Sequence, residues 1–138
     1  GLSRQDFINI LDKSHCISAD NAHAVHHNYP ERHDSNHSPL INQGVVIKSN
    51  VGQRYATSST SIAPFIDACN KAKVPIQYFA SRNNIACGST IGPITATRLG
   101  IDTIDVGIPQ LSMHSAREVC GTQDPIFLRD ALQSYFAR

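Results

Sequence analysis

The residues best suited to chemistry are an aspartate and several histidines in one polar stretch. Asp20 is followed by His23 and His27, and on a helix these three side chains would share one face. Carboxylates and neutral imidazoles are common ligands of zinc and manganese. The pattern is compatible with a local metal site, although no H-E-x-x-H motif accompanies it. An alternative without metal explains the same residues. In it, Asp20 caps the next turn and the histidines hydrogen-bond to the backbone.

A further histidine, His114, stands alone in the largely apolar sequence L-S-M-H-S over residues 111–115. A lone histidine in such a stretch is more often a satisfied core residue than a ligand, and by position alone both readings stay open. The other histidines, His26, His33 and His37, are expected to be structural or exposed.

Several residues could receive an anion. Lys48 ends the apolar run Val45–Ile47 and could attract an anion into a cleft, although lysines at strand edges also discourage aggregation. Tyr55 could line the same cleft or pack its loop. The small residues Gly88, Ser89 and Thr90 lead into a helix start, where free N–H groups can meet a carboxylate or phosphate. The lysine of a phosphate-binding P-loop is missing, and a tight turn with a helix cap fits equally well.

Composition narrows the function classes. The chain has 138 residues, twelve Lys and Arg against eleven Asp and Glu, and a net charge of +1. This balance argues against a nucleic-acid-binding arm. No apolar run approaches the ~20 residues of a membrane span, and the first residues show no signal-peptide pattern. We therefore expect no nucleic-acid partner and no membrane association.

The four cysteines form no C-x-x-C pair and no zinc-finger spacing. They are expected to be reduced, buried or half-buried thiols of a cytoplasmic protein. Cys87 has no evident base beside it that would make it a nucleophile. Glutamate is scarce, since only Glu31 and Glu118 occur against seven histidines.

Apolar periodicity and turn signals predict the elements that position these residues. Helices are expected over about 4–13, 61–73, 92–99 and from 124 onward, and strands over 16–19, 45–48, 76–80 and 103–106. Pro64 is expected in the first turn of its helix and Asp124 as a helix cap. Residues 21–43 should form a long ordered loop. This order predicts an α/β fold with a mixed or largely parallel sheet and flanking helices. Four loops that follow strands could then converge on one edge of the sheet.

Read together and in order, these segments resemble the C-terminal part of the catalytic domain of the aspartyl aminopeptidase family, zinc aminopeptidases related to yeast vacuolar aminopeptidase I. The resemblance runs from about residue 15 to the C-terminus and departs at His27, where the family usually has proline. The matching stretches are S-A-D-N-A-H-A-V-H (18–26), V-I-K (46–48), Q-R-Y-A (53–56), R-N-N (82–84), C-G-S-T-I-G-P-I (87–94) and D-V-G-I-P-Q-L-S-M-H-S-A-R-E (105–118).

The resemblance implies an exopeptidase that removes N-terminal Asp or Glu with water activated by two zinc ions, for which manganese or cobalt could substitute. It assigns Asp20 and His114 as ligands, one to each metal. Lys48 and Tyr55 match substrate-pocket positions, and Lys48 would pair with the acidic side chain of the substrate. His23 would join this pocket. Gly88, Ser89 and Thr90 would shape its floor. The family forms homo-oligomers, commonly of twelve subunits.

The family's pattern also needs an upstream His ligand, a bridging Asp, and a Glu-Glu pair that supplies the general base and a ligand. No Glu-Glu pair occurs here. Residues 1–138 therefore resemble only a C-terminal segment, without the N-terminal segment and dimerisation insert. The isolated chain is expected to be inactive and to need the N-terminal segment as its partner. The alternative is a non-catalytic assembly or regulatory fragment of the same oligomeric enzyme.

Overall fold

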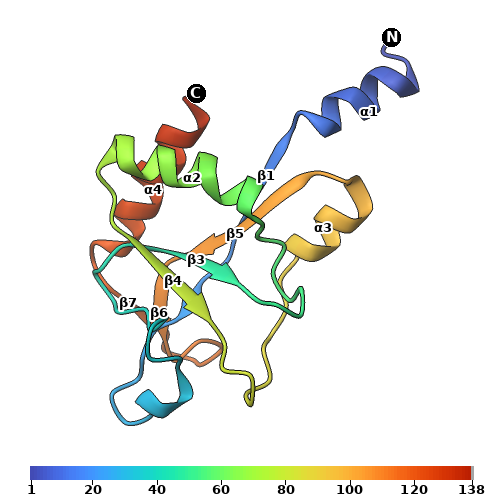
Figure 1. Cartoon of the computed structure of the whole chain (residues 1–138). Coiled ribbons are helices and arrows are strands. Elements are labelled where there is room, and N and C mark those ends of the chain that lie inside the picture. Colours follow the sequence, from blue (N-terminus) through green and yellow to red (C-terminus); the bar gives the residue numbers. More distant parts are fainter. Residues whose placement is uncertain (138) are drawn as a thin grey trace.

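A four-stranded mixed sheet forms the centre of the molecule, in a computed structural model that describes residues 1–137. Its strands are β1 (His15–Ala19), β3 (Val45–Ser49), β4 (Ile76–Ala80) and β5 (Asp102–Gly107), in the order β1-β5-β3-β4. β1 and β5 are parallel, as are β3 and β4, whereas β3 and β5 are antiparallel. The predicted mixed α/β fold is confirmed (Figure 1).

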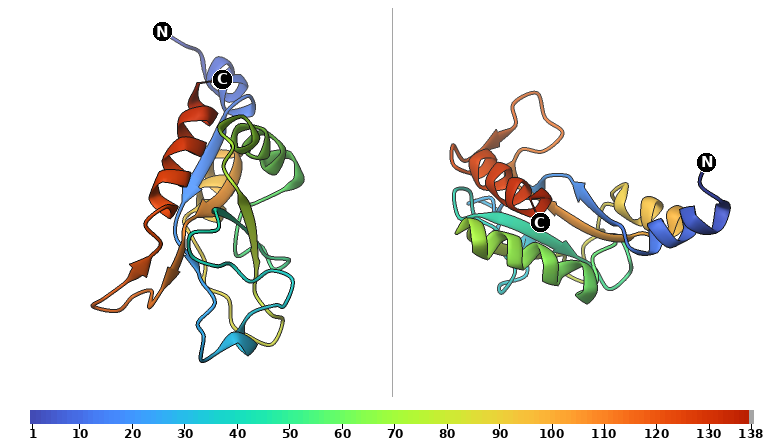
Figure 2. Two further views of the ribbon diagram at one scale, coloured as in Figure 1. Left: turned by 90° about the vertical axis from the view of Figure 1, so that its left-hand side faces the viewer. Right: turned by 90° about the horizontal axis from the view of Figure 1, so that it is seen from above.

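The two faces of this sheet have different characters because strand residues alternate between them. On one face, Val45 and Ile47 of β3 and Ile104 and Val106 of β5 pack into the main apolar core. The helices α2 (Ser59–Ala72) and α4 (Asp124–Phe136) contact each other and cover this face with Phe65, Cys69 and Ala131, among others (Figure 2). The alternating positions Val46, Lys48 and Asp105 are left for the opposite face, where the site lies.

A second sheet of three very short strands joins the ends of the first sheet's strands. It contains β2 (Ala22–His23), β6 (Pro109–Leu111) and β7 (Val119–Cys120), in the order β2-β6-β7. The periodicity of the sequence did not predict these strands, because two or three residues are too few to show alternation. The long loop between β2 and β3 contains one 3-10 turn, η1 (Pro30–Arg32).

The two remaining helices lie toward one end of the molecule (Figure 1). α1 (Arg4–Asp12) begins with a capping box between Ser3 and Asp6, and it has no buried residue. α3 (Gly92–Leu99) begins with a Gly-Pro pair and ends at Gly100, which adopts a left-handed conformation as expected for a helix-terminating glycine. The described residues include no helix that is both long and apolar enough to cross a bilayer.

Three local predictions were wrong. Ser58 caps α2, so the helix begins earlier than expected and Pro64 lies inside it rather than in its first turn. Asp124 is the first residue of α4 instead of its cap, and Gln123 occupies the cap position. Cys120 is exposed, although every thiol was expected to be buried or half-buried. Cys69 fits that expectation, because its burial raises the pKa of the thiol to about 11.

Asp124 uses its fully buried carboxylate to join the start of α4 to the loop before β3. One oxygen accepts the N–H of Gly121 at 2.9 Å, and both accept the N–H of Asn42, at 2.9 and 3.0 Å. We expect Asp124→Ala to lower the free energy of unfolding by about 3 kcal/mol, because it leaves two amides without an acceptor. Urea-induced unfolding measures this change in the free energy of unfolding. The control is Asp130→Ala on the same helix, where a surface pair with Arg129 is worth less than ~1 kcal/mol. Equal midpoints for the two variants would contradict the assignment.

Candidate functional site

A pocket of about 340 Å³ brings together the eight residues that the family resemblance assigned to the site. The predicted residues that line it are Asp20, His23, Lys48, Tyr55, Gly88, Ser89, Thr90 and His114. They come from β2 and the link before it, from β3 and the loop after it, and from the loops that follow β4 and β6. These segments meet in one pocket, but they meet over a face of the sheet and not at one edge as predicted, because β3 and β4 run antiparallel to β1 and β5. The role of each residue stays a prediction.

Asp20 reaches the pocket because the chain after β1 continues beside the chain after β5. The N–H of Asp20 donates to the carbonyl of Val106 at 2.8 Å, and the N–H of Ala22 donates to that of Ile108 at 2.9 Å. Gly107 permits this close approach, since a Cβ at that position would lie 1.8 Å from the carbonyl oxygen of Asp20. The same pairing directs the chain toward His114, so both predicted ligands depend on it.

Lys48 is the most deeply buried of the charged residues in the pocket. Only 1% of its surface is exposed, and its Nζ lies 3.0 Å from Oδ2 of Asp20. The Nζ also donates to the carbonyl of Asn21 at 3.3 Å and lies 5.1 Å from the centre of the Tyr55 ring. The ammonium group predicted to bind an acidic substrate is therefore paired with a carboxylate of the chain itself. An ammonium group has three donors, so one remains for a further acceptor beside these two hydrogen bonds.

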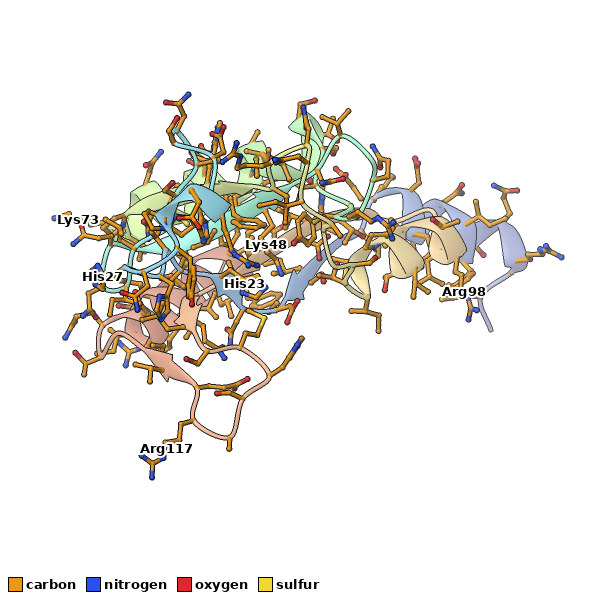
Figure 3. The ribbon with its side chains drawn as sticks, turned by 90° about the horizontal axis from the view of Figure 1, so that it is seen from below. His23, His27, Lys48, Lys73, Arg98 and Arg117 are labelled. Carbon is orange, nitrogen blue, oxygen red and sulfur yellow. The ribbon has the colours of Figure 1, made fainter. Side chains whose placement is uncertain are left out.

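His23 lies beside Lys48 in the pocket (Figure 3). Partial burial lowers the pKa of His23, and the nearby His114 and Lys48 lower it further, against the opposing effect of Asp20. This imidazole is therefore favoured in its neutral form, in which one nitrogen can accept a hydrogen bond or bind a metal.

His114 is exposed in the pocket, so it is not the core histidine that its apolar neighbours suggested. Its backbone adopts a left-handed conformation with φ of 69°, which is uncommon for a residue with a side chain. The N–H of His114 donates to Oε1 of Glu118 at 2.7 Å, and this contact fixes the turn. Glu118 thus holds the histidine through its backbone, a role that sequence reasoning missed.

Tyr55 forms part of the pocket wall and is 7% exposed. Burial raises the pKa of its phenol, as does the hydrogen bond from Cys87, whose Sγ lies 3.5 Å from Oη. The phenol is therefore neutral at physiological pH and can donate a hydrogen bond into the pocket.

The idea of a purely local Asp20–His23–His27 site was wrong. Residues 22 and 23 form strand β2 rather than a helix, and His27 does not line the pocket (Figure 3). His33, in contrast, was expected to be structural or exposed and was not assigned to the site, but it lines the pocket and packs edge-on against Phe79. Its position could not be read from the sequence, because the irregular loop around it has no periodicity.

The donor set suits zinc but is incomplete. One carboxylate and three imidazoles reach the pocket, from Asp20, His23, His33 and His114. Protein zinc sites usually need three or four ligands around one ion. No group of three or more His, Cys, Asp or Glu within residues 1–137 has the geometry to hold a metal. Asp20 and His114 therefore fit as members of zinc ligand sets whose other members are not in this group of residues.

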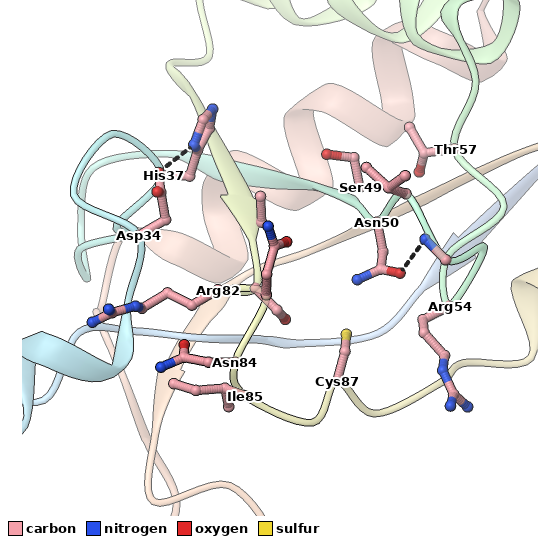
Figure 4. Close-up of a pocket in the computed structure, with 15 residues that line it drawn as sticks. Asp34, His37, Ser49, Asn50, Arg54, Thr57, Arg82, Asn84, Ile85 and Cys87 are labelled. Carbon is pink, nitrogen blue, oxygen red and sulfur yellow. Dashed lines mark hydrogen bonds and ion pairs between the residues drawn. The ribbon is translucent and has the colours of Figure 1, made fainter.

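A wider cavity of about 880 Å³ adjoins the pocket and shares Ser81, Ile85 and Cys87 with it (Figure 4). Its other walls are largely polar and include Asn50, Arg54 and Arg82. None of the predicted metal ligands lines this cavity. It extends the pocket along the loops that follow β3 and β4.

The sequence of this chain matches that of known proteins. Residues 2–136 match the family described as aminopeptidase I zinc metalloprotease (M18). The chain is 50% identical over 135 residues to a probable M18 family aminopeptidase 2 of Pseudomonas savastanoi pv. phaseolicola, a match that covers 98% of this chain and 32% of that protein. It therefore spans about a third of the length of the curated relatives that it matches.

The chain also superposes on solved structures. The chain superposes with a TM-score of 0.96 and 44% identity on a chain of the Ape4 and Nbr1 complex, covering 99% of this chain and 26% of that one. It superposes with a TM-score of 0.86 and 31% identity on a chain of the S. cerevisiae mApe1 dodecamer, covering 96% of this chain and 29% of that one.

Proposed function

This chain belongs to the M18 family of aminopeptidase I zinc metalloproteases, and from that premise we propose that it forms part of the active site of a zinc aminopeptidase specific for acidic N-terminal residues. In this proposal Asp20 and His114 each contribute a ligand to one of two zinc ions. Lys48, Tyr55 and His23 bind the substrate, and Gly88, Ser89 and Thr90 shape the pocket floor.

The observation that carries the proposal is the arrangement around Lys48. A buried ammonium lies in the same pocket as Asp20 and His114, which come from distant parts of the chain. A buried lysine is costly unless an anion compensates its charge. Asp20 supplies one anion, and the remaining donor of Lys48 can bind the carboxylate of an acidic substrate residue. A site built in this way favours Asp or Glu over neutral and basic residues.

The chemistry assigns separate tasks to these side chains. When bound, two zinc ions polarise the scissile carbonyl and lower the pKa of the attacking water. His23 is favoured as a neutral imidazole and can accept a hydrogen bond from the substrate's N-terminal amine. Tyr55 remains a neutral phenol and can donate one to the substrate.

The general base and the remaining ligands are proposed to come from a segment outside these 138 residues. Glu118 already accepts the N–H of His114, and Glu31 lies on the 3-10 turn η1, outside the pocket. We place the complete enzyme in the cytoplasm as a homo-oligomer. One of the matched structures is described as a dodecamer, which supports an oligomeric assembly.

Reconstitution tests this proposal. The purified chain is combined with the part of an M18 relative that lies outside the matched third, and hydrolysis of an Asp-terminal fluorogenic peptide is followed. Activity is expected only in the combination, together with bound zinc, and is expected to disappear when zinc is chelated and to return when it is added back. Activity of the chain alone would contradict its dependence on a partner segment.

A non-catalytic assembly role is the second candidate. It predicts that the chain associates with the complementary segment and leaves no zinc in the complex. Zinc analysis of the same reconstituted sample therefore separates the two functions.

A further inference from the structure

A buried carboxylate beneath the pocket links two of its walls. Asp105 lies on β5, is fully buried and points to the pocket side of the sheet. Its Oδ2 accepts the N–H of Ala56 at 2.6 Å, and its Oδ1 accepts the hydroxyl of Thr90 at 2.6 Å. Its own N–H donates to Oγ1 of Thr57 at 3.0 Å. One residue of the central sheet therefore holds the loop after β3 and the loop before α3.

These two loops carry the pocket residues directly beside the points of attachment. Tyr55 precedes Ala56, and Gly88 and Ser89 precede Thr90. The loops also contact each other, because Cys87 donates to Tyr55 and the hydroxyl of Ser89 lies 3.4 Å from the carbonyl of Arg54. The contacts between the loops are thus weak or long, whereas the contacts to Asp105 are short.

The start of α3 is adapted to this carboxylate. A Cβ on Gly92 would lie 2.3 and 2.5 Å from the two carboxylate oxygens of Asp105. No side chain fits there without moving the carboxylate. Gly92 therefore allows the helix to begin directly above Asp105, which places the Thr90 hydroxyl within bonding distance.

We propose that Asp105 is a positioning residue for the substrate pocket, because its carboxylate sets the separation between the wall that carries Tyr55 and the floor around Thr90. Asp105 does not line the pocket, so it acts on the substrate only through these two loops. An aspartate suits this task, since both of its oxygens accept hydrogen bonds from donors on opposite loops. This inference rests on the proposed function for its effect on the substrate, but the attachment of the loops can be tested without activity.

The test uses Thr90→Val, which removes the hydroxyl with little change in shape, and Thr90→Ser, which keeps it. Thr97→Val is the matched control, because the Thr97 hydroxyl donates within α3 itself, to the carbonyl of Pro93. In the reconstituted enzyme, Thr90→Val is expected to raise KM for an Asp-terminal peptide about tenfold, equivalent to ~1.4 kcal/mol, with little change in kcat. Thr90→Ser should recover most of that loss. An unchanged KM, or a fall in kcat alone, would reduce Asp105 to a structural residue and overturn the inference.

A second measurement needs only the 138-residue chain. Cys87 belongs to the loop before α3 and contacts Tyr55 of the loop after β3, so its rate of alkylation reports how the two loops are held together. Exposed Cys120 serves as an internal reference. Thr90→Val is expected to speed alkylation of Cys87 at least fivefold without affecting Cys120, and Thr97→Val should change neither rate. An unchanged alkylation rate of Cys87 in Thr90→Val would contradict the proposed attachment of the loops to Asp105. If the reconstituted wild type is inactive, the proposed function fails, and this measurement still decides whether Asp105 holds the loops.

Discussion

Replacing Asp20 with alanine is expected to lower kcat/KM of the reconstituted enzyme by more than about a hundredfold. Loss of a group that merely supports a metal ligand typically costs 10- to 100-fold in metal affinity or activity, so loss of a ligand itself should cost more. The substitution also leaves the buried Lys48 without its anionic partner. His114→Ala is expected to have a comparable effect on activity while leaving Lys48 paired. Kinetics with an Asp-terminal peptide and zinc analysis of the same samples measure both effects.

The control for these two variants is Asp12→Ala. Asp12 is the last residue of α1, is exposed and does not line the pocket. It should retain wild-type zinc content and turnover. If Asp20→Ala and His114→Ala keep full zinc and full activity, neither residue is a metal ligand.

Replacing Lys48 is expected to change the specificity of the enzyme. Lys48→Met keeps an unbranched apolar stem in the buried position but removes the charge. We expect kcat/KM for Asp-terminal peptides to fall about a hundredfold, since losing one partner of a buried charge pair costs 2–5 kcal/mol. Neutral Leu-terminal peptides should lose much less. Lys48→Glu should deepen the loss for Asp, because like charges would then meet. The ratio of kcat/KM between Asp- and Leu-terminal peptides is the measurement.

Lys73→Met is the matched control for the lysine substitution. Lys73 is the C-cap of helix α2, is exposed and lies outside the pocket (Figure 3). Its specificity ratio should equal that of the wild type. An unchanged ratio in Lys48→Met would mean that Lys48 only balances Asp20 and does not select the substrate.

The helices and the strands of the central sheet were predictable because each carries its own local signal. β3 and β4 are short apolar runs between turn residues, and α3 begins with Gly-Pro and ends with glycine. The second sheet was not predictable, because its two- and three-residue strands are defined by pairing between segments that lie far apart in the sequence or across a turn. Pro109, which lies in β6, is a residue that argues against a strand in sequence-based reasoning.

The residues of the candidate site also divide into those that the sequence identified and those that it did not. Asp20, Lys48 and His114 were identifiable because their neighbours match a family motif. The supporting residues were not identifiable, because their roles depend on contacts with distant segments. Asp105 reads simply as an alternating polar position in a strand, and Glu118 as one of two glutamates. The hydrogen bonds that give these carboxylates their roles appear only in the folded structure.

The pairing that brings Asp20 and His114 together also has a kinetic consequence. The side chains of Asn21 and Gln110 hydrogen-bond across this junction, although 89 positions separate them in the sequence. Contacts between such remote segments form slowly, because closing a large loop costs entropy before any stabilising contact is made. The two predicted ligands should therefore come together late in folding. Fully folded chains would then bind zinc more tightly than partly folded ones, because both ligands are in place in the folded chain alone.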